Sequence, residues 1–122
     1  MKTALLLMAH GSRQAEANAD LLHAAVQLRQ RGEYDLVEAS FLELAEPSIL
    51  QAGLSCVEQG AERVVMLPYF LSAGVHVRRD LTALCEELAR RFPVVDFRLA
   101  QPLGRHPLLL DVVAARVREA LG

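Results

Sequence analysis

Two histidines, His10 and His76, each lie just past a short apolar run with the composition of a buried strand. The first run spans residues 3–9 and the second spans residues 63–70. In open parallel α/β sheets, ligands bind at the carboxyl ends of strands, where the strand order reverses. An imidazole can bind a metal ion or transfer a proton near neutral pH. The pair therefore predicts a metal or proton-transfer site at one edge of a parallel sheet.

The residue after His10 strengthens this interpretation. Gly11 allows a ligand to approach the backbone closely, because glycine has no side chain. The alternative is a structural histidine at the end of a strand, satisfied by a backbone carbonyl. His-Gly is only a two-residue signal, so it does not decide between the two by itself.

A carboxylate, Glu43, follows the second predicted strand and should reach the same sheet edge. An acid in an exposed loop is usually just solvated, so its interest comes from its location. Two imidazoles and one carboxylate form a suitable ligand set for a divalent first-row metal such as cobalt, iron or nickel. The predicted metal ligands are therefore His10, Glu43 and His76.

A small-residue segment, Ser72-Ala73-Gly74, leads into His76 and could shape a pocket wall. It is followed by Arg78 and Arg79, which open the third predicted helix. Cations at a helix N-terminus oppose the helix dipole, and a bound anion would remove that conflict. The alternative is that both arginines point into solvent.

The elements that position these residues alternate regularly between strand and helix. The predicted strands cover residues 3–9, 35–42, 63–70 and 94–100, and the predicted helices cover 13–31, 47–59, 78–92 and 107–121. Such alternation indicates an α/β fold with a four-stranded parallel sheet and helices on both faces. Right-handed crossovers with one reversal give the strand order 2-1-3-4. In the last helix an apolar stripe is formed by Leu110, Val113, Val117 and Leu121.

Composition limits the class of protein. The 122 residues form one predicted domain, 1–122, and the formal net charge of −2 gives no sign of nucleic-acid binding. The isolated cysteines, Cys56 and Cys85, are typical of a reducing compartment. No apolar segment is long enough to span a bilayer and no signal peptide is visible, so we expect a cytoplasmic protein without membrane contact.

Taken in order, several segments resemble the short, single-domain sirohydrochlorin cobaltochelatases, the small CbiX type of the class II chelatase superfamily. The matching segments are residues 9–13 (AHGSR), 41–43 (FLE) with Pro47 and Ser48, Gly60 with Ala61, 67–76 (LPYFLSAGVH) with Asp80, and 102–104 (PLG) with His106 and Pro107. The resemblance covers essentially the whole chain.

This resemblance implies a chelatase-like, flavodoxin-like fold and ATP-independent insertion of a divalent metal into a modified tetrapyrrole, without an organic cofactor. It implies that His10 and His76 carry the metal and accept protons, with Glu43 as a third ligand or proton acceptor. It also implies a symmetric homodimer, because larger relatives look like two such domains fused. The carboxylates of sirohydrochlorin would meet a substrate-binding set made of Arg13, Ser72, Ala73, Gly74, Arg78, Arg79 and, as a further candidate, Arg105.

Three alternatives remain open at this point. A non-catalytic carrier of metal or tetrapyrrole would use the same residues. A histidine phosphatase also has His-Gly after its first strand, but that family resemblance expects an arginine where Ala9 stands. An iron oxygenase with two histidines and a carboxylate is disfavoured by the α/β pattern. Cobalt is the first choice of metal, with Fe²⁺ and Ni²⁺ as alternatives.

Overall fold

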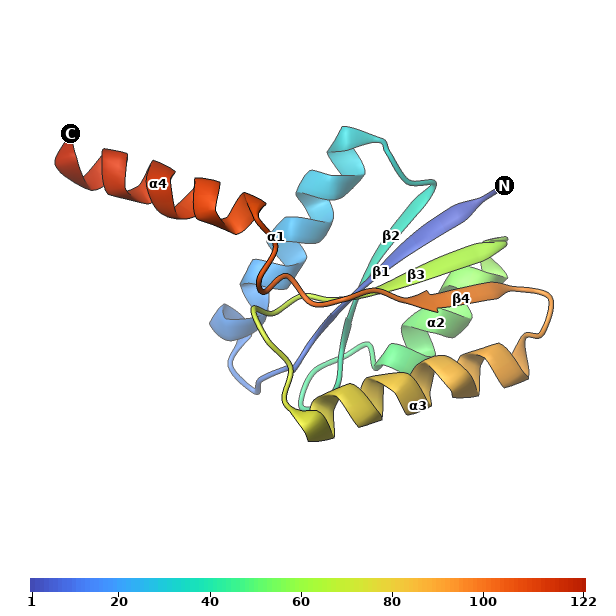
Figure 1. The fold of residues 1–122 in the computed structure, drawn as a ribbon. Helices are drawn as coiled ribbons and strands as arrows, with labels where there is room; N and C mark the ends of the chain where they lie inside the picture. The colour runs from blue at the N-terminus through green and yellow to red at the C-terminus, as the bar shows by residue number, and fades with distance from the viewer.

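The computed structural model describes all 122 residues, which alternate between strands and helices as predicted. Its elements are β1 (Thr3–Ala9), α1 (Ala15–Arg31), β2 (Leu36–Phe41), α2 (Ile49–Glu58), β3 (Arg63–Pro68), α3 (Val75–Arg91), β4 (Asp96–Leu99) and α4 (Leu108–Leu121). The four strands are parallel and lie in the order β2-β1-β3-β4, which confirms the predicted sheet (Figure 1). The switch point therefore lies between β1 and β3.

Helices cover both faces of the sheet, and β1 contributes to both cores. Leu6 and Met8 belong to the apolar cluster beneath α2 and α3, whereas Leu5 and Leu7 belong to the cluster beneath α1. Successive strand residues point to opposite faces, so a strand buried on both sides needs a continuous apolar sequence. This explains why β1 contains no polar residue after Thr3.

The helix starts differ slightly from the predicted ones, because local caps decide them. α2 begins at Ile49, after a capping box in which Ser48 accepts from the Gln51 N–H and the Gln51 side chain accepts from the Ser48 N–H. α1 begins at Ala15, because the Ser12 hydroxyl accepts from the Gln14 N–H in a turn before the helix. α1 ends at Arg31 and is followed by Gly32, whose φ of 71° suits a left-handed cap.

The last helix departs from the expectation that every helix covers the sheet. α4 projects away from the body of the molecule (Figure 1), and none of its residues is buried. The cause lies in the preceding segment, where Leu103 N–H donates to the Phe70 carbonyl and Gly104 packs against the Leu71 backbone. No helix of the chain has the length and apolar character needed to cross a bilayer.

Candidate active site

The carboxyl end of β1 is hydrogen-bonded to the segments that follow its two neighbouring strands. Leu42 N–H donates to the Ala9 carbonyl, and Glu43 N–H donates to the His10 carbonyl, each over 2.9 Å. On the other side, Tyr69 N–H donates to the Met8 carbonyl over 2.7 Å. These bonds fix the loops after β2 and β3 around the residue that ends β1. The edge predicted to hold the site is therefore a defined backbone frame.

His10 stands at the centre of this frame and is exposed to solvent. Its imidazole stacks on the ring of Phe70, with centroids 4.6 Å apart and the planes inclined by 27°. Such offset stacking fixes the orientation of a ring while leaving its nitrogens free. His10 is therefore oriented by packing and remains available for a ligand.

Gly11 is required by its close contact with the loop that carries Glu43. Its φ is 93°, and an added Cβ would lie 1.8 Å from the Glu43 carbonyl oxygen. Only glycine fits such a position, because a side chain would meet backbone and the left-handed conformation is strained for other residues. The sequence predicted that Gly11 lets a ligand approach the backbone closely. In the structure, the group that approaches Gly11 is the Glu43 carbonyl of the same chain.

The loop after His10 is held to α1 by a reciprocal pair of hydrogen bonds. Ser12 N–H donates to the Asn18 side-chain oxygen over 2.9 Å, and the Asn18 amide donates to the Ser12 carbonyl over 2.8 Å. This pair fixes the turn from which the exposed side chain of Arg13 emerges. Asn18 had no role in the predicted site, although its amide side chain in the first turn of a helix is a recognisable loop anchor.

His76 lies in the first turn of α3, whereas the sequence placed it in the loop before a helix beginning at residue 78. The helix begins at Val75 because Gly74 adopts an extended conformation and acts as N-cap. The first turn has no acidic residue and no side-chain cap, so its free N–H groups leave a positive helix end at this edge. His76 is exposed on this turn.

The three predicted metal ligands do not form a cluster within one chain. His10, Glu43 and His76 are all exposed, and no group of three or more histidine, cysteine, aspartate or glutamate side chains is close enough to hold a metal ion. The frame therefore brings the Glu43 backbone against His10 and Gly11 without assembling a three-ligand site. Such openness suits a metal that must be released rather than stored.

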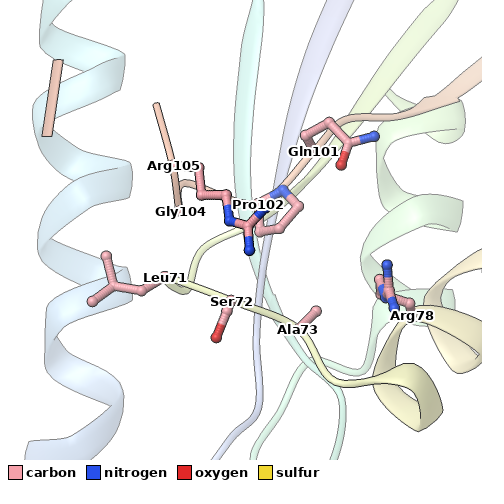
Figure 2. A pocket seen from close by; sticks show the side chains of 8 residues that line it. All are labelled: Leu71, Ser72, Ala73, Arg78, Gln101, Pro102, Gly104 and Arg105. Carbon is pink, nitrogen blue, oxygen red and sulfur yellow. The ribbon is translucent and has the colours of Figure 1, made fainter. Parts of the chain in front are cut away.

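A pocket of about 390 Å³ lies at the same edge, beside the start of α3. Figure 2 shows Arg78 reaching it from α3 and Arg105 reaching it from the segment before α4. Ser72 and Ala73 form the wall between the two arginines, as the small-residue segment predicted. Two guanidinium groups near a helix N-terminus favour anionic groups such as carboxylates.

Other residues of the predicted substrate-binding set lie outside this pocket. Arg79 lines a neighbouring groove on α3 with Glu86 and Thr82, and Arg78 contributes to that groove as well as to the pocket. Arg13 and Gly74 line neither space. The side chains at residues 78 and 79 diverge because successive helical residues point about 100° apart.

The pocket also contains residues that were not in the predicted substrate-binding set. Its lining is completed by Leu71, Gln101, Pro102 and Gly104. An added Cβ on Gly104 would lie 1.6 Å from the Leu71 carbonyl oxygen. The segment after β4 is therefore in close backbone contact with the segment after β3. Gln101 follows β4, and the rule that strand ends gather at one edge would have found it. His106 lies at the start of α4, where its Nδ1 accepts from Leu108 N–H over 3.2 Å.

Comparison with known proteins matches this chain to a family model and to proteins named chelatases. The CbiX family model matches residues 4–120. The chain is 40% identical to the chloroplastic sirohydrochlorin ferrochelatase of Arabidopsis thaliana, covering 96% of this chain and 52% of the relative. It is 30% identical to the sirohydrochlorin cobaltochelatase of Methanopyrus kandleri, covering 98% of this chain and 97% of that relative.

A solved structure has the same fold. The sirohydrochlorin chelatase SirB of Bacillus subtilis subspecies spizizenii, in complex with cobalt, superposes with a TM-score of 0.86 at 28% identity, over 98% of this chain and 51% of SirB. The chain thus spans about half the length of the Arabidopsis and Bacillus relatives and nearly all of the Methanopyrus one. With a match over almost its whole length, the chain belongs to the CbiX family.

Proposed function

We propose that this protein inserts a divalent metal, cobalt in the first instance, into sirohydrochlorin without ATP. The observation that carries the proposal is the stacked, solvent-accessible His10 at the end of β1, in a chain of the CbiX family. Relatives of this chain are named sirohydrochlorin cobaltochelatase and sirohydrochlorin ferrochelatase. Cobalt and iron are therefore both candidate substrates.

The reaction needs a metal carrier and a base close together. A divalent ion enters the macrocycle and two pyrrole N–H protons leave, so charge and atoms balance. We assign metal delivery to His10 and His76 and proton acceptance to whichever imidazole is not bound to metal, with Glu43 as a third ligand or acceptor. A neutral imidazole can perform either task. Few ligands and open coordination allow the metal to pass to the macrocycle.

The pocket lined by Arg78 and Arg105, here called the arginine pocket, favours a tetrapyrrole that carries many carboxylates. Arg78 and Arg105 both line the pocket, and Arg105 has a φ of 64°, which is unusual for a residue with a side chain. Backbone strain of this kind persists where surrounding structure holds it, often at binding sites. We propose that the two guanidinium groups bind side-chain carboxylates of the pigment while its ring faces His10.

A homodimer would close the site. The exposure of His10, Glu43 and His76 leaves one face of a bound macrocycle uncovered in a single copy. The chain matches only about half of SirB, which supports a second copy in place of the remaining length. A two-fold pair is the commonest arrangement of such assemblies.

Two free cysteines, Cys56 and Cys85, support action in the reducing cytoplasm.

The proposal is tested by an absorbance time course of sirohydrochlorin with Co²⁺, Fe²⁺ or Ni²⁺, with and without protein. We expect protein-dependent metallation that His76→Ala abolishes without changing the circular dichroism spectrum. His23→Ala is the matched control, because His23 is an exposed histidine in the middle of α1. Binding of the pigment with no acceleration for any metal would overturn catalysis and indicate a carrier.

A further inference from the structure

The loop between β2 and α2 contains a leucine in a conformation that leucine rarely adopts. Leu44 has a φ of 62°, in the left-handed region, and Arg105 is the only other non-glycine residue of the chain with a positive φ. A side chain makes this conformation unfavourable, because its Cβ comes too close to the following carbonyl oxygen. Glycine or asparagine would suit the position better. The local backbone therefore gives no reason for a leucine here.

Hydrogen bonds on both sides of Leu44 hold the strained conformation in place. Glu43 N–H donates to the His10 carbonyl, and Phe41 N–H donates to the Pro47 carbonyl, each over 2.9 Å. Strain persists where the surrounding structure determines the backbone in this way. Because the residue before Leu44 is bonded to the backbone of His10, Leu44 lies at the sheet edge where α3 also begins (Figure 1).

The side chain of Leu44 is exposed, although its apolar neighbours are packed. Leu42 packs against the apolar cluster beneath α2 and α3, and Ala45 packs against the cluster beneath α1. Leu44 belongs to neither cluster and is 53% exposed. A single exposed leucine is common on protein surfaces, but a strained one is not. The loop thus adopts an unfavourable conformation that leaves an apolar side chain in solvent.

The two strained residues lie on opposite sides of His10. β1, which ends at His10, has β2 on one side and β3 on the other. Leu44 follows β2, whereas Arg105 is held over the segment after β3, because Gly104 lies against the Leu71 backbone. Strained residues gather at ligand sites. A ligand over His10 would therefore meet an apolar group on one side and a guanidinium group on the other.

We propose that Leu44 is a specificity-determining residue, whose side chain packs on the tetrapyrrole ring while the arginine pocket binds the carboxylates. This inference rests on the proposed function and names the contact on the β2 side of the site. A tetrapyrrole has apolar ring faces and carboxylates at its periphery, so it uses both kinds of contact. The ring covers the exposed surface of the leucine. Because the fold already fixes the loop, binding requires little further ordering.

The first experiment is a fluorescence titration of sirohydrochlorin without metal, which separates binding from insertion. We expect Leu44→Asn to weaken binding roughly 3- to 10-fold, as for loss of about half of a buried leucine side chain. Leu44→Met should restore most of the affinity, because methionine keeps an apolar side chain of similar volume. Leu22→Asn is the matched control, since Leu22 is 49% exposed in the middle of α1. Natural affinity in Leu44→Asn would overturn the proposal.

Thermal unfolding separates a ligand contact from a structural role. Asparagine tolerates the left-handed conformation, so Leu44→Asn should unfold at a temperature at least as high as the natural protein. A leucine that supports the fold would behave differently, because its replacement would lower the thermal midpoint. A lower midpoint together with weaker binding would therefore refute the proposed contact.

Salt dependence tests whether the contact is apolar. Salt screens charges, so the affinity ratio between the natural protein and Arg78→Ala should shrink as the salt concentration is raised. The corresponding ratio for Leu44→Asn should stay constant, because an apolar contact is not screened. A Leu44→Asn ratio that shrinks like that of Arg78→Ala would rule out packing on the ring.

Two parallel measurements keep this inference separate from the other proposals. Light scattering should give the same oligomeric state for Leu44→Asn and the natural protein, and a difference would show that the leucine packs on protein instead. Metal insertion is measured on the natural protein. If it metallates sirohydrochlorin and Leu44→Asn binds the pigment equally well, only the role of Leu44 fails. If Leu44→Asn loses affinity but the natural protein inserts no metal, only the chelatase proposal fails.

Discussion

The imidazole of His10 and the ring of Phe70 form a stacked pair that joins the ends of β1 and β3, the two strands at the switch point of the sheet. The Phe70 carbonyl also accepts from Leu103 N–H, so the pair is continuous with the segment that lines the arginine pocket. The orientation of His10 and the shape of the pocket therefore depend on one short stretch after β3.

Loss of the stack should slow metal insertion without unfolding the protein. Aromatic pairs contribute about 0.5–1.5 kcal/mol beyond their burial, so we expect Phe70→Leu to lower the insertion rate roughly 2- to 10-fold. The control is Phe97→Leu, which removes a partner from the Phe92–Phe97 pair away from this edge. Initial rates of pigment metallation check the prediction, and an equal effect of both variants would contradict it.

Gly11 should tolerate no side chain. Gly11→Ala places a Cβ 1.8 Å from the Glu43 carbonyl oxygen at a positive φ, so the loop after β2 must move. Gly32→Ala is a matched control, because Gly32 also has a positive φ but has nothing within 4 Å. We expect a loss of roughly 1–2 kcal/mol for Gly32→Ala and a larger loss, with no metal insertion, for Gly11→Ala. Urea unfolding provides the comparison.

The two arginines that open α3 should differ in their effect on pigment binding. Arg78 lines both the pocket, with Arg105, and the groove on α3, whereas Arg79 lines the groove and not the pocket. A hydrogen bond to a charged group contributes about 1.5–3 kcal/mol, so Arg78→Ala should weaken sirohydrochlorin binding by roughly 10- to 100-fold. Arg79→Ala should change it little. Fluorescence titration of the pigment checks this prediction, and a larger effect of Arg79→Ala than of Arg78→Ala would contradict it.

Acid should remove a small stabilisation between β3 and β4. Hydrogen bonds from Arg98 and then Arg63 lower the pKa of Asp96 below its ordinary value of 3.8. A carboxyl group with a lowered folded-state pKa stabilises the fold above pH 3.8 and loses that effect as pH falls further through the folded value. We therefore expect Asp96→Asn to reduce the thermal midpoint at pH 7 and to match the natural protein in strong acid. A difference that persisted or grew in acid would contradict the assignment.

The strand order could be predicted because it follows from apolar runs and from the handedness of the crossovers. β1 and β3 are recognisable by their composition, and His10 lies at the end of β1 as expected. The start of α3 could not be predicted, because Gly74 acts as N-cap through its backbone alone. The apolar stripe from Leu110 to Leu121 was recognised, but a stripe alone does not reveal that α4 projects away from its own sheet.

The pocket was predicted only in part, because its wall depends on a contact between distant segments. Ser72 and Ala73 were identified from their small size, whereas the close approach of Gly104 to Leu71 has no local signal. Arg105 was only a further candidate, and its positive φ is visible only in three dimensions. For adjacent residues such as Arg78 and Arg79, the sequence does not show which side chain faces the pocket until the start and orientation of the helix are known.

The most direct test of the central claim is metal insertion by His10→Ala, with cobalt and sirohydrochlorin, following pigment absorbance and proton release together. If His10 carries the metal or accepts a proton, the natural protein releases two protons for each metallated pigment, and His10→Ala lowers the rate by about 10²- to 10⁴-fold. His23→Ala should keep the natural rate. A natural rate in His10→Ala would contradict the account, because the stacked histidine at the end of β1 would then have no part in the reaction.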